Sequence, residues 1–518
     1  MSLQIVVLTL SMILTLLFFL YGFNHYYLLF ASRKYLAPDL PVSEAGFLPG
    51  VSIHLPIYNE KYVVHRLVDA CVNMAKEYGS EKVQILIIDD STDDTVKIID
   101  EIIKEYCEKH IRIEVLHRQS REGFKAGALQ AALDRTDEEF IAIFDADFIP
   151  PADFLVRTLP FFFRDERLGI IQSRWTYINR EYNFLTRAIA IGIDVHFLIE
   201  QAGRFTAGCF QNFNGSGGVL RKKALQESGG WQSDTLAEDL DVSYRIQMQG
   251  YHILYLKDLQ SAGEIPPTVP SFKKQQGRWA CGSLRTARKI LPALLKKSDL
   301  GFKKRFQAFI HLTGYIIHPL MLFSFLLVCF SSLYKIDTFK INLQGIPLLF
   351  MTNNPENWSA FLGTLSQLIA WGLFLSLIFL CTIAAWISPV TTLKRQGLST
   401  IKNMVSLMIL FLLGCGVSLN NSIEAGKALF TNQIFEFKRT PKYAMHNKRE
   451  EWQNKKYQVP LDYVWLLELV LVCLGGAAIR FAIWRANFAV LLILIPYTAA
   501  YSFVLLLTVR QSREEKVT

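Results

Sequence analysis

Four short segments carry side chains suited to phosphate and proton-transfer chemistry. Three are acidic: IIDDSTDDT at 87–95, FDADF at 144–148 and AEDLD at 237–241. The fourth, QQGRW at 275–279, follows them and ends in an arginine and a tryptophan. Carboxylates of this kind can hold a metal–diphosphate group and supply a catalytic base. The segments therefore predict a site for a diphosphate-bearing ligand and a base.

FDADF contains a DxD motif, in which one residue separates Asp145 from Asp147. On the extended end of a strand, this spacing would point both carboxylates to one face. We expect Asp147 to ligate Mg²⁺ or Mn²⁺, because these ions suit oxygen ligands and substrate phosphates. A DxD motif alone is common and is often only a turn. Its place after IIDDSTDD and a further strand favours the metal interpretation.

The general base is expected in AEDLD. A base must lie within about 3 Å of the hydroxyl that it deprotonates and have a pKa near the working pH. Asp239 is the candidate, with Glu238 as its neighbour. The alternative is an acidic cluster at a helix N-terminus that complements the helix dipole. That alternative would account for Asp239 or Asp241 on its own.

Two loops that follow predicted strands are candidates for nucleotide contacts. Tyr58 in PIYNE could stack on a base, and Arg118 and Lys125 in HRQSREGFKAGAL could approach a diphosphate. Gly123 and Gly127 flank Lys125 at the start of a helix, where backbone N–H groups favour anions. Each of these residues alone would more often be an ordinary loop residue.

Two later segments are candidates for sugar contacts. FNGSGGVLRKKAL (213–225) is a glycine-dense turn leading into a helix. It is either a tight connection that needs positive φ or a backbone surface that a flat sugar ring can approach. In QQGRW, Arg278 can make bidentate bonds to a diphosphate, and Trp279 can stack on a sugar ring. The surrounding segment Ser271–Leu295 is typical of a basic amphipathic helix on a membrane surface, where an Arg–Trp pair is otherwise only an anchor.

Alternating strand and helix patterns surround these segments. The alternation predicts an α/β fold with a mostly parallel sheet and helices on both faces. Ligands of such sheets bind beyond the carboxyl ends of the strands, where residues 87–90 and 144–147 fall. The predicted strands are 51–56, 83–88, 112–116 and 140–144, and the predicted helices are 62–76, 92–109 and 124–135.

Composition indicates a membrane protein with a soluble part. The chain has 518 residues, of which 51% are hydrophobic, and a mean hydropathy of +0.23. It exceeds one ordinary domain, and charges run through 45–300 whereas long apolar runs occupy the two ends. A membrane-spanning helix needs about 20 apolar residues. The runs near that length are Ile5–Tyr21, Phe309–Tyr334, Phe361–Trp386, Tyr463–Ile483 and Phe488–Leu507, and Met404–Val417 is shorter.

Basic residues predict the orientation. The first apolar run lacks a preceding basic residue and a cleavage pattern, so we expect a retained anchor. Arg33 and Lys34 follow it, which places the soluble part in the cytoplasm by the positive-inside rule. The basic loop 425–460 is then also cytoplasmic only if 401–424 is re-entrant, interfacial or a broken pair of short helices. The expected domains are an anchor at 1–34, a cytoplasmic domain with an interfacial helix at 45–300, and a membrane region at 301–518.

Charge and cysteine content exclude other classes of protein. The net charge is +9, and basic residues at a membrane interface account for it, so we expect a lipid bilayer and no nucleic acid as partner. The eight cysteines are scattered without a Cys-x-x-Cys pair. This pattern indicates free thiols in a reducing compartment and no disulfide framework or zinc site.

In chain order, PIYNE, DDSTDDT, KAGAL, DAD, FNGSGG, AED, QQGRW and FKRTPK (437–442) resemble the motifs of membrane-type inverting glycosyltransferases of family 2. The resemblance is closest to the cellulose-synthase-like subgroup, which makes β-1,4-glucan or mannan backbones. It covers residues 45–445. It implies a GT-A-like cytoplasmic domain, which is a Rossmann-related mixed sheet with helices on both faces, and an α-helical transmembrane bundle.

Together with the residues above, the resemblance implies a complete site. The catalytic base would be Asp239, with Glu238 beside it. The donor would be held by Tyr58, Asp89, Asp90, Lys125, Asp145, Asp147, Gln275 and Arg278, with the metal ion on Asp147. The acceptor would contact Gln172, Trp175, Phe213, Gly215 and Trp279. Phe437 and Thr440 would belong to a gating loop over the nucleotide.

Two features depart from the family pattern. Ala237 stands where bacterial cellulose synthases carry threonine, and the chain ends soon after its last apolar run. We therefore expect no C-terminal cyclic-dinucleotide-binding barrel and no regulation of that kind within the chain.

The resemblance implies a processive enzyme that polymerises a β-linked glucan or mannan from a nucleotide sugar, with translocation across the membrane as an open extension. UDP-glucose is slightly favoured as donor over GDP-mannose. One alternative is a non-processive enzyme that adds one sugar to a membrane lipid. The other is a transporter or channel, which would line its pathway with ionisable residues. The apolar runs contain few of these, chiefly His318, Glu468 and Arg480.

Overall fold

The computed structural model of the chain describes residues 3–41, 48–334, 380, 383–431, 442–444 and 459–514. The chain divides into two compact units. The larger unit comprises Leu28–Tyr315, Glu424–Pro460 and Gln511–Thr518. The smaller unit comprises Met1–Tyr27, Ile316–Ile423 and Leu461–Arg510. All the acidic segments belong to the larger unit.

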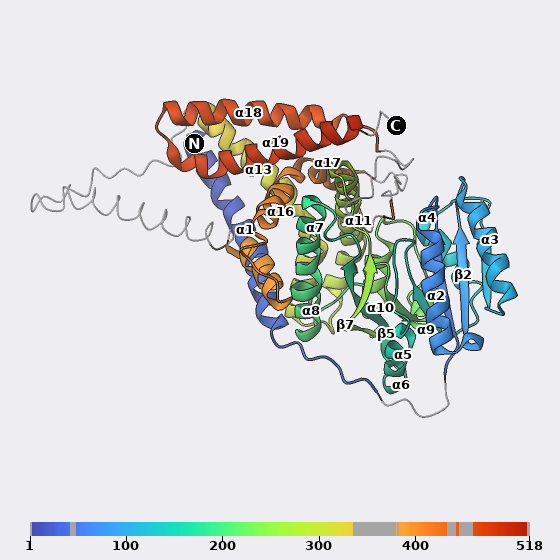
Figure 1. Cartoon of the computed structure of the whole chain (residues 1–518). Coiled ribbons are helices and arrows are strands. Elements are labelled where there is room, and N and C mark those ends of the chain that lie inside the picture. Colours follow the sequence, from blue (N-terminus) through green and yellow to red (C-terminus); the bar gives the residue numbers. More distant parts are fainter. Residues whose placement is uncertain are drawn as a thin grey trace, which may run out of the picture. The chain divides into compact units, whose positions relative to one another are not determined.

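The larger unit is built on a seven-stranded sheet with the strand order β3-β2-β1-β4-β6-β5-β7. Strands β2, β5 and β7 of this sheet are labelled in Figure 1. Strand β6 is antiparallel to β4 and β5, and every other neighbouring pair is parallel. The predicted α/β class is confirmed, with a mixed sheet. The strands are β1 Val51–Ile57, β2 Val83–Asp89, β3 Ile113–His117, β4 Phe140–Ile143, β5 Leu168–Tyr177, β6 Gly218–Arg221 and β7 His252–Gly263.

Helices cover both faces of this sheet, as predicted. On one face, strand residues such as Ile53 and Ile85 are completely buried against α2, α3 and α5. On the other face, residues such as Leu86 and Ile141 pack against α4, α9 and α10. Burial on both faces explains why the strands read as continuous apolar runs. These helices are α2 Val64–Tyr78, α3 Thr95–Glu108, α4 Phe124–Leu133, α5 Phe154–Thr158, α9 Lys222–Glu227 and α10 Glu238–Met248.

A long helix, α11 Val269–Lys296, confirms the helix predicted for 271–295. It starts where the Thr268 side chain accepts a hydrogen bond from the Ser271 backbone N–H, a typical N-cap. Strand β7 leads into it through the short segment 264–268. The remaining elements of this unit are the 3₁₀ turn Ser80–Lys82, α6 Pro160–Arg164, α7 Phe184–Val195, the π-helical turn His196–Gln201, α8 Ala202–Thr206 and α12 Phe302–Leu312.

Two segments differ from their predicted conformation. The glycine-dense segment 213–225 forms strand β6 before the helix, because Gly215 and Gly217, at φ 81° and 69°, turn the chain back between β4 and β5. The DxD motif lies on a turn and not on an extended strand end, and the Phe148 N–H donates to the Asp145 carbonyl across that turn, at 3.0 Å.

In the part of the chain that the structure describes, four helices are long and apolar enough to cross a membrane, or five if a bent pair is one span. The bent pair, α16 Met404–Gly416 and α17 Ser418–Phe430, turns by 41° and fits both the broken pair and the re-entrant element expected at 401–424. Most of the predicted run 361–386 lies outside the described residues. The four helices are α1 Leu3–Ser32, Gly314–Leu333 (a 3₁₀ turn and α13 Ile317–Leu333), α18 Val464–Trp484 and Leu491–Ser512 (within α19 Leu491–Glu514, after the 3₁₀ turn Phe488–Val490).

The carboxyl ends of the parallel strands meet at one edge of the sheet. Tyr58 follows β1, Asp90 follows β2, and Asp145 follows β4 by two residues. Because β6 is antiparallel to both β4 and β5, strands β5 and β7 also end at this edge, where Glu264 follows β7. Loops at such an edge are the usual place for a ligand site in α/β sheets.

Candidate active site

A cavity lies at this edge and brings most of the predicted residues together. Strand ends supply one wall, and the first turns of α4 and α10 and the N-terminal half of α11 supply the others. The predicted residues that line it are Tyr58, Asp90, Lys125, Asp145, Asp147, Trp175, Glu238, Asp239, Gln275, Arg278 and Trp279.

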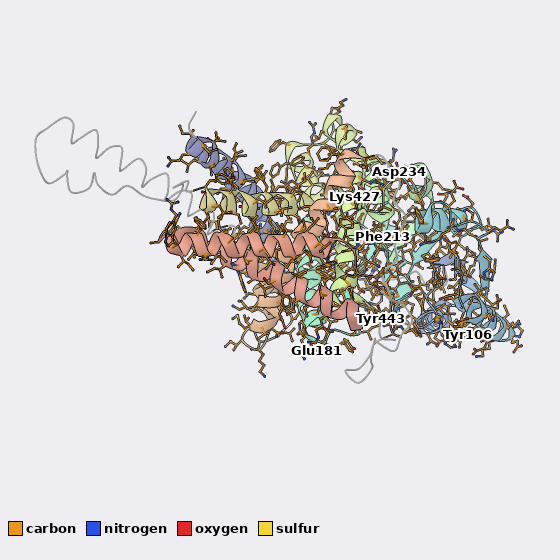
Figure 2. The ribbon with its side chains drawn as sticks, turned by 90° about the horizontal axis from the view of Figure 1, so that it is seen from above. Tyr106, Glu181, Phe213, Asp234, Lys427 and Tyr443 are labelled. Atoms are coloured by element: carbon orange, nitrogen blue, oxygen red, sulfur yellow. The ribbon has the colours of Figure 1, made fainter. Side chains whose placement is uncertain are left out.

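Four predicted residues do not line the cavity. Asp89 is buried below the loop, where its carboxylate accepts from the Ser91 N–H at 2.9 Å and contacts His117 Nδ1 at 2.9 Å. Phe213, labelled in Figure 2, is completely buried in the core beneath β6. Gln172 is also buried, and its amide donates to the Ser216 carbonyl at 3.1 Å. Gly215 is the fourth, and the predicted gating-loop residues Phe437 and Thr440 lie outside the described residues.

The two aspartates of the DxD motif face different cations. Asp145 Oδ1 lies 2.6 Å from Lys125 Nζ, and Asp147 Oδ2 lies 2.7 Å from Lys442 Nζ. Burial raises the pKa of Asp145 in spite of Lys125. Burial also acts to raise the pKa of Asp147, but the charge and hydrogen bond of Lys442 outweigh it, and the pKa is lowered. Asp147 is thus held as an anion.

The chemistry of these residues fits a divalent cation. Carboxylate oxygens are the ligands that Mg²⁺ and Mn²⁺ prefer, and Asp147 already holds one cation, the Lys442 ammonium. Among the described residues, no three His, Cys, Asp or Glu side chains form a complete metal cluster. A metal ion at Asp147 would therefore take its other ligands from substrate phosphates and water.

Asp239 lies in the first turn of α10 and has the properties of a base. Burial, followed by the charge of Glu238, raises the pKa of Asp239 to about 7, and Lys125 opposes the rise. Its Oδ1 accepts from the Leu240 N–H at 2.8 Å. A Cβ at Gly215 would lie 2.9 Å from Asp239 Oδ2, so the glycine makes room for this carboxylate.

Lys125 connects the DxD motif to the base. Besides Asp145, its Nζ contacts Glu238 Oε1 at 3.5 Å and donates to the Gly215 carbonyl at 2.9 Å. Lys125 lies in the first turn of α4, a helix that begins directly after Gly123, whose φ is 70°. It is a cation among three carboxylates, and their charges outweigh its burial and raise its pKa.

The sequence allowed Arg118 to approach a diphosphate, but its side chain does not line the cavity. Its Nε and Nη2 donate to the two carboxylate oxygens of Asp90, at 2.7 Å and 2.5 Å, and its Nη1 donates to the Glu122 carbonyl at 3.0 Å. This bidentate type of pairing fixes the Asp90 carboxylate and ties the loop before α4 to the end of β2. Arg118 therefore orients a cavity residue from behind.

The predicted arginine of α11 is half-buried among the acidic residues. Burial lowers the pKa of Arg278, and the charges of Glu238, Asp145 and Asp239 oppose that change. A guanidinium keeps its charge even so, because its ordinary pKa is above 12. Together with Lys125, Arg278 gives this acidic cavity a positive lining where a diphosphate could bind.

Several cavity residues were not predicted. Glu264 Oε1 pairs with Arg66 Nη2 at 2.7 Å, and its Oε2 accepts from the backbone N–H of Tyr443 (Figure 2) at 3.2 Å. The Arg121 guanidinium lies 3.5 Å from the centroid of the Tyr58 ring. The place of Glu264 after a strand was the available signal, but strand β7 was not predicted. Further polar cavity residues that were missed are Glu60, Tyr177, Asn214 and Lys442.

Curated relatives carry names from polysaccharide synthesis. The probable glucomannan 4-beta-mannosyltransferase 4 of Oryza sativa subsp. japonica is 34% identical over 309 residues, which cover 58% of this chain and 56% of the relative. Glucomannan 4-beta-mannosyltransferase 2 of Arabidopsis thaliana is 36% identical over 261 residues, 50% of this chain and 48% of the relative. The chain thus spans about half the length of the curated relatives that it matches.

Solved structures give weaker likenesses. A mannosyltransferase from Pyrobaculum calidifontis in complex with GDP-Man and Mn²⁺ has a TM-score of 0.49 and 17% identity, covering 74% of this chain and 98% of that one. S. aureus TarS 1–349 in complex with UDP has a TM-score of 0.33 and 13% identity, covering 56% of this chain and 89% of that one. At these scores neither likeness carries a conclusion about the site.

Two family models match the chain. Glycosyl transferase family 2 matches residues 52–227, which include the DxD motif. Glycosyl transferase family group 2 matches residues 140–417, more than half of the 518 residues. Both matches confirm the family that the motifs resemble. The chain belongs to glycosyl transferase family group 2.

Proposed function

We propose that the protein is an inverting, processive glycosyltransferase that polymerises a β-linked glucan or mannan from a nucleotide sugar. One observation carries the proposal: Asp145, Asp147, Asp239 and Arg278 line a single cavity although they come from distant parts of the chain. A carboxylate with a pKa of about 7 in that cavity is suited to proton transfer near neutral pH.

Transfer would proceed as a single displacement. The acceptor hydroxyl oxygen attacks the anomeric carbon while the bond from that carbon to the diphosphate oxygen breaks. The hydroxyl proton goes to Asp239, and the nucleoside diphosphate leaves. One displacement inverts an α-linked donor to a β-linked product.

The other cavity residues would hold the leaving group and the sugars. Lys125 and Arg278 face the place where charge develops on the diphosphate, and preorganised charges of this kind are often the largest contribution to catalysis. A divalent ion, Mg²⁺ or Mn²⁺, held at Asp147 would neutralise further charge on the diphosphate. Tyr58 and Asp90 would contact the nucleoside, and Trp175 and Trp279 would stack on sugar rings.

GDP-mannose is the favoured donor. The sequence alone slightly favoured UDP-glucose, but the curated relatives are named as mannosyltransferases. The proposed acceptor is the growing glycan. The four candidate membrane-spanning helices support a membrane protein, and the basic residues after the first apolar run support a cytoplasmic position for the larger unit. Product translocation through those helices would follow from processive synthesis. The alternative, transfer of one sugar to a membrane lipid, would give a single-sugar lipid and no polymer.

The test is donor turnover by the full-length chain in lipid nanodiscs. GDP-mannose and UDP-glucose are each supplied with Mn²⁺, and released nucleotide and glycan product are measured. The variant Asp239→Asn should lower turnover by about 10²- to 10⁴-fold, the usual contribution of a general base, while nucleotide binding persists. Asp258→Asn, at an exposed carboxylate on β7, is the control. Full turnover by Asp239→Asn would remove Asp239 from the base role, and no release from any nucleotide sugar would reject the proposed activity.

A further inference from the structure

The candidate site is divided between two helices. Asp239 lies in the first turn of α10, whereas Arg278 and Trp279 lie on α11. The separation between the base and the group that would hold the diphosphate therefore depends on how these helices pack. The two helices pack through apolar side chains such as Leu240 and Ile290, and two further contacts join them at Gly282 and Lys289.

The first contact is a close approach at Gly282. A Cβ at this position would lie 2.8 Å from Ala237 Cβ, 3.0 Å from the Ala237 backbone N and 3.0 Å from the Leu236 carbonyl carbon. The backbone of α11 thus touches the chain immediately before α10, at a distance that only glycine permits. Ala237 directly precedes Glu238 and Asp239, so a shift at this contact would move the base.

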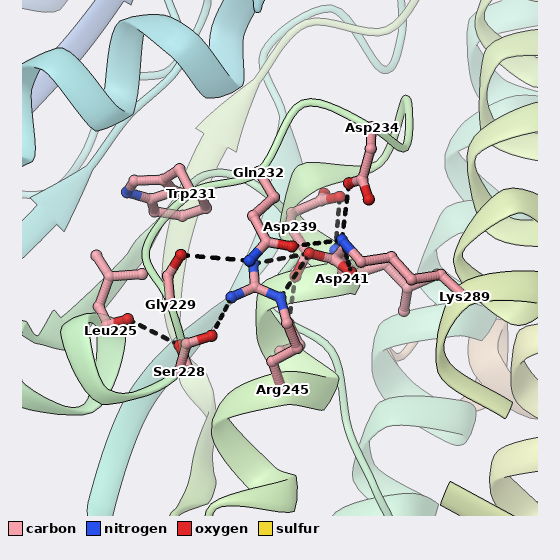
Figure 3. A network of polar contacts seen from close by, with 12 residues as sticks. Leu225, Ser228, Gly229, Trp231, Gln232, Asp234, Asp239, Asp241, Arg245 and Lys289 are labelled. Atoms are coloured by element: carbon pink, nitrogen blue, oxygen red, sulfur yellow. Dashed lines mark hydrogen bonds and ion pairs between the residues drawn. The ribbon is translucent and has the colours of Figure 1, made fainter. Parts of the chain in front are cut away.

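The second contact is a cluster of charged residues around Lys289 (Figure 3). Lys289 Nζ on α11 lies 3.0 Å from Asp241 Oδ1 and 2.7 Å from Asp234 Oδ1. It also donates to Gln232 Oε1 at 2.6 Å. Lys289 thus joins α11 both to α10 and to the loop before α10.

Asp241 is completely buried and is shared by two cations. Its Oδ2 accepts from Arg245 Nε at 2.7 Å, one turn further along α10, while Oδ1 faces Lys289. Arg245 alone would keep the Asp241 charge compensated within α10. Loss of Lys289 would therefore leave the Asp241 carboxylate paired with Arg245, which avoids the large cost of a buried charge without a partner. It would remove the contacts of α11 with α10 and with the loop before α10.

The two contacts lie on the same face of α11 as Arg278. Positions four and eleven residues further along a helix return close to the same direction, because one turn takes about 3.6 residues. Gly282 and Lys289 occupy those positions. One face of α11 thus reaches into the cavity at Arg278, touches the chain before the base at Gly282, and binds the chain on both sides of the base at Lys289.

We propose that Lys289 and Gly282 are positioning residues, which hold the first turn of α10 against α11 and so set the separation of Asp239 from Arg278. The expected loss of catalytic rate rests on the proposed function. The contact between the helices does not depend on that function. Misplacing a reacting group by about 1 Å can cost about 10²-fold in rate. Neither residue touches the cavity, so binding of the nucleotide should not depend on them.

The experiment compares Lys289→Met with Lys289→Arg and Lys296→Met in the full-length chain in nanodiscs. Lys296 is an exposed lysine on the same helix and serves as the matched control. Lys289→Met should lower kcat by about ten- to hundredfold, with the KM for the nucleotide sugar and the Kd for its nucleotide within about twofold. Lys289→Arg, which can restore the ion pairs, should recover most of kcat, and Lys296→Met should equal the unaltered protein.

Hydrogen exchange provides a readout that needs no turnover. Peptides covering residues 236–245 should exchange faster in Lys289→Met and in Gly282→Ala than in Lys296→Met, with peptides of β1 and β2 unchanged. Unchanged exchange at 236–245 would overturn the inference, as would a Lys289→Met enzyme with full kcat. Equal losses of kcat and nucleotide binding, without recovery by arginine, would also overturn it. If the unaltered chain transferred no sugar, the proposed function would fail. Hydrogen exchange would still show whether Lys289 and Gly282 hold α10 against α11.

Discussion

Asp239 combines two influences that oppose each other. Burial and the neighbouring Glu238 favour its protonated form, whereas Lys125 favours the anion, and the result is a pKa of about 7. A carboxylate with an ordinary pKa near 4 would be a weak acceptor for the proton of a sugar hydroxyl. The same surroundings that make the anion costly thus make it a better base.

This value of the pKa predicts how the rate depends on pH. Because the base must be deprotonated, kcat/KM should fall as the pH drops through about 7, approaching a tenfold loss for each further pH unit. Initial rates between pH 5 and 9 with limiting donor measure this dependence. A rate that stays constant down to pH 5 would show that no group with this pKa controls the reaction.

Single residues were predictable from the sequence where a motif stood at the end of a recognisable strand. Asp145 and Asp147 line the cavity for this reason, whereas Asp239, which was predicted from its acidic motif, lies in the first turn of α10. The sequence could not show which of Asp89 and Asp90 lines the cavity. Only the fold shows that the Asp89 carboxylate accepts from the Ser91 N–H and contacts His117. Glu264 was missed because its partners, Arg66 and the Tyr443 N–H, are distant in sequence.

At the scale of elements, local pattern predicted the parallel half of the sheet. Strands β1 to β4 and helices α2 to α4 begin and end within about three residues of their predicted bounds, since each has its own apolar periodicity. The antiparallel strand β6 was not predicted. Its residues follow a run of glycines, and pairing with β4 and β5 determines its conformation more than local preference does.

The short segment Lys442–Ala444 contacts the site through Lys442 and Tyr443. Lys442 Nζ donates to Asp147 Oδ2 at 2.7 Å, and the Tyr443 N–H donates to Glu264 Oε2 at 3.2 Å. The Lys442 ammonium thus occupies an oxygen of Asp147 that a divalent cation would need. Segment and metal would compete for the same carboxylate when no nucleotide is bound.

Removal of the ammonium should therefore strengthen metal binding. We expect Lys442→Met to lower the Kd for Mn²⁺ of the nucleotide-free protein by about tenfold, equivalent to about 1.4 kcal/mol. Electron paramagnetic resonance of free Mn²⁺ during titration measures the Kd. Lys223→Met, at an exposed lysine on α9, is the control and should change nothing. An unchanged or weaker affinity in Lys442→Met would contradict the competition.

At the scale of the whole molecule, composition predicted a charged α/β part and long apolar helices. Apolar runs of about 20 residues specify helices locally, which is why α1, α18 and α19 were anticipated. The short run at 404–417 was harder to interpret because SLNNS interrupts it. In the smaller unit, Ser418 bonds to the Tyr501 hydroxyl at 2.8 Å and Asn421 to His318 at 3.1 Å. Tertiary partners, which the sequence does not show, accommodate these polar residues.

The configuration of the new glycosidic bond tests the central claim most directly. The claim is that Asp239, the DxD aspartates and Arg278 act together in one direct displacement. The product that the full-length chain in nanodiscs makes from an α-linked nucleotide sugar can be isolated, and its anomeric configuration determined by nuclear magnetic resonance. The proposed mechanism predicts a β linkage in all of the product. An α linkage would contradict a single displacement at this site.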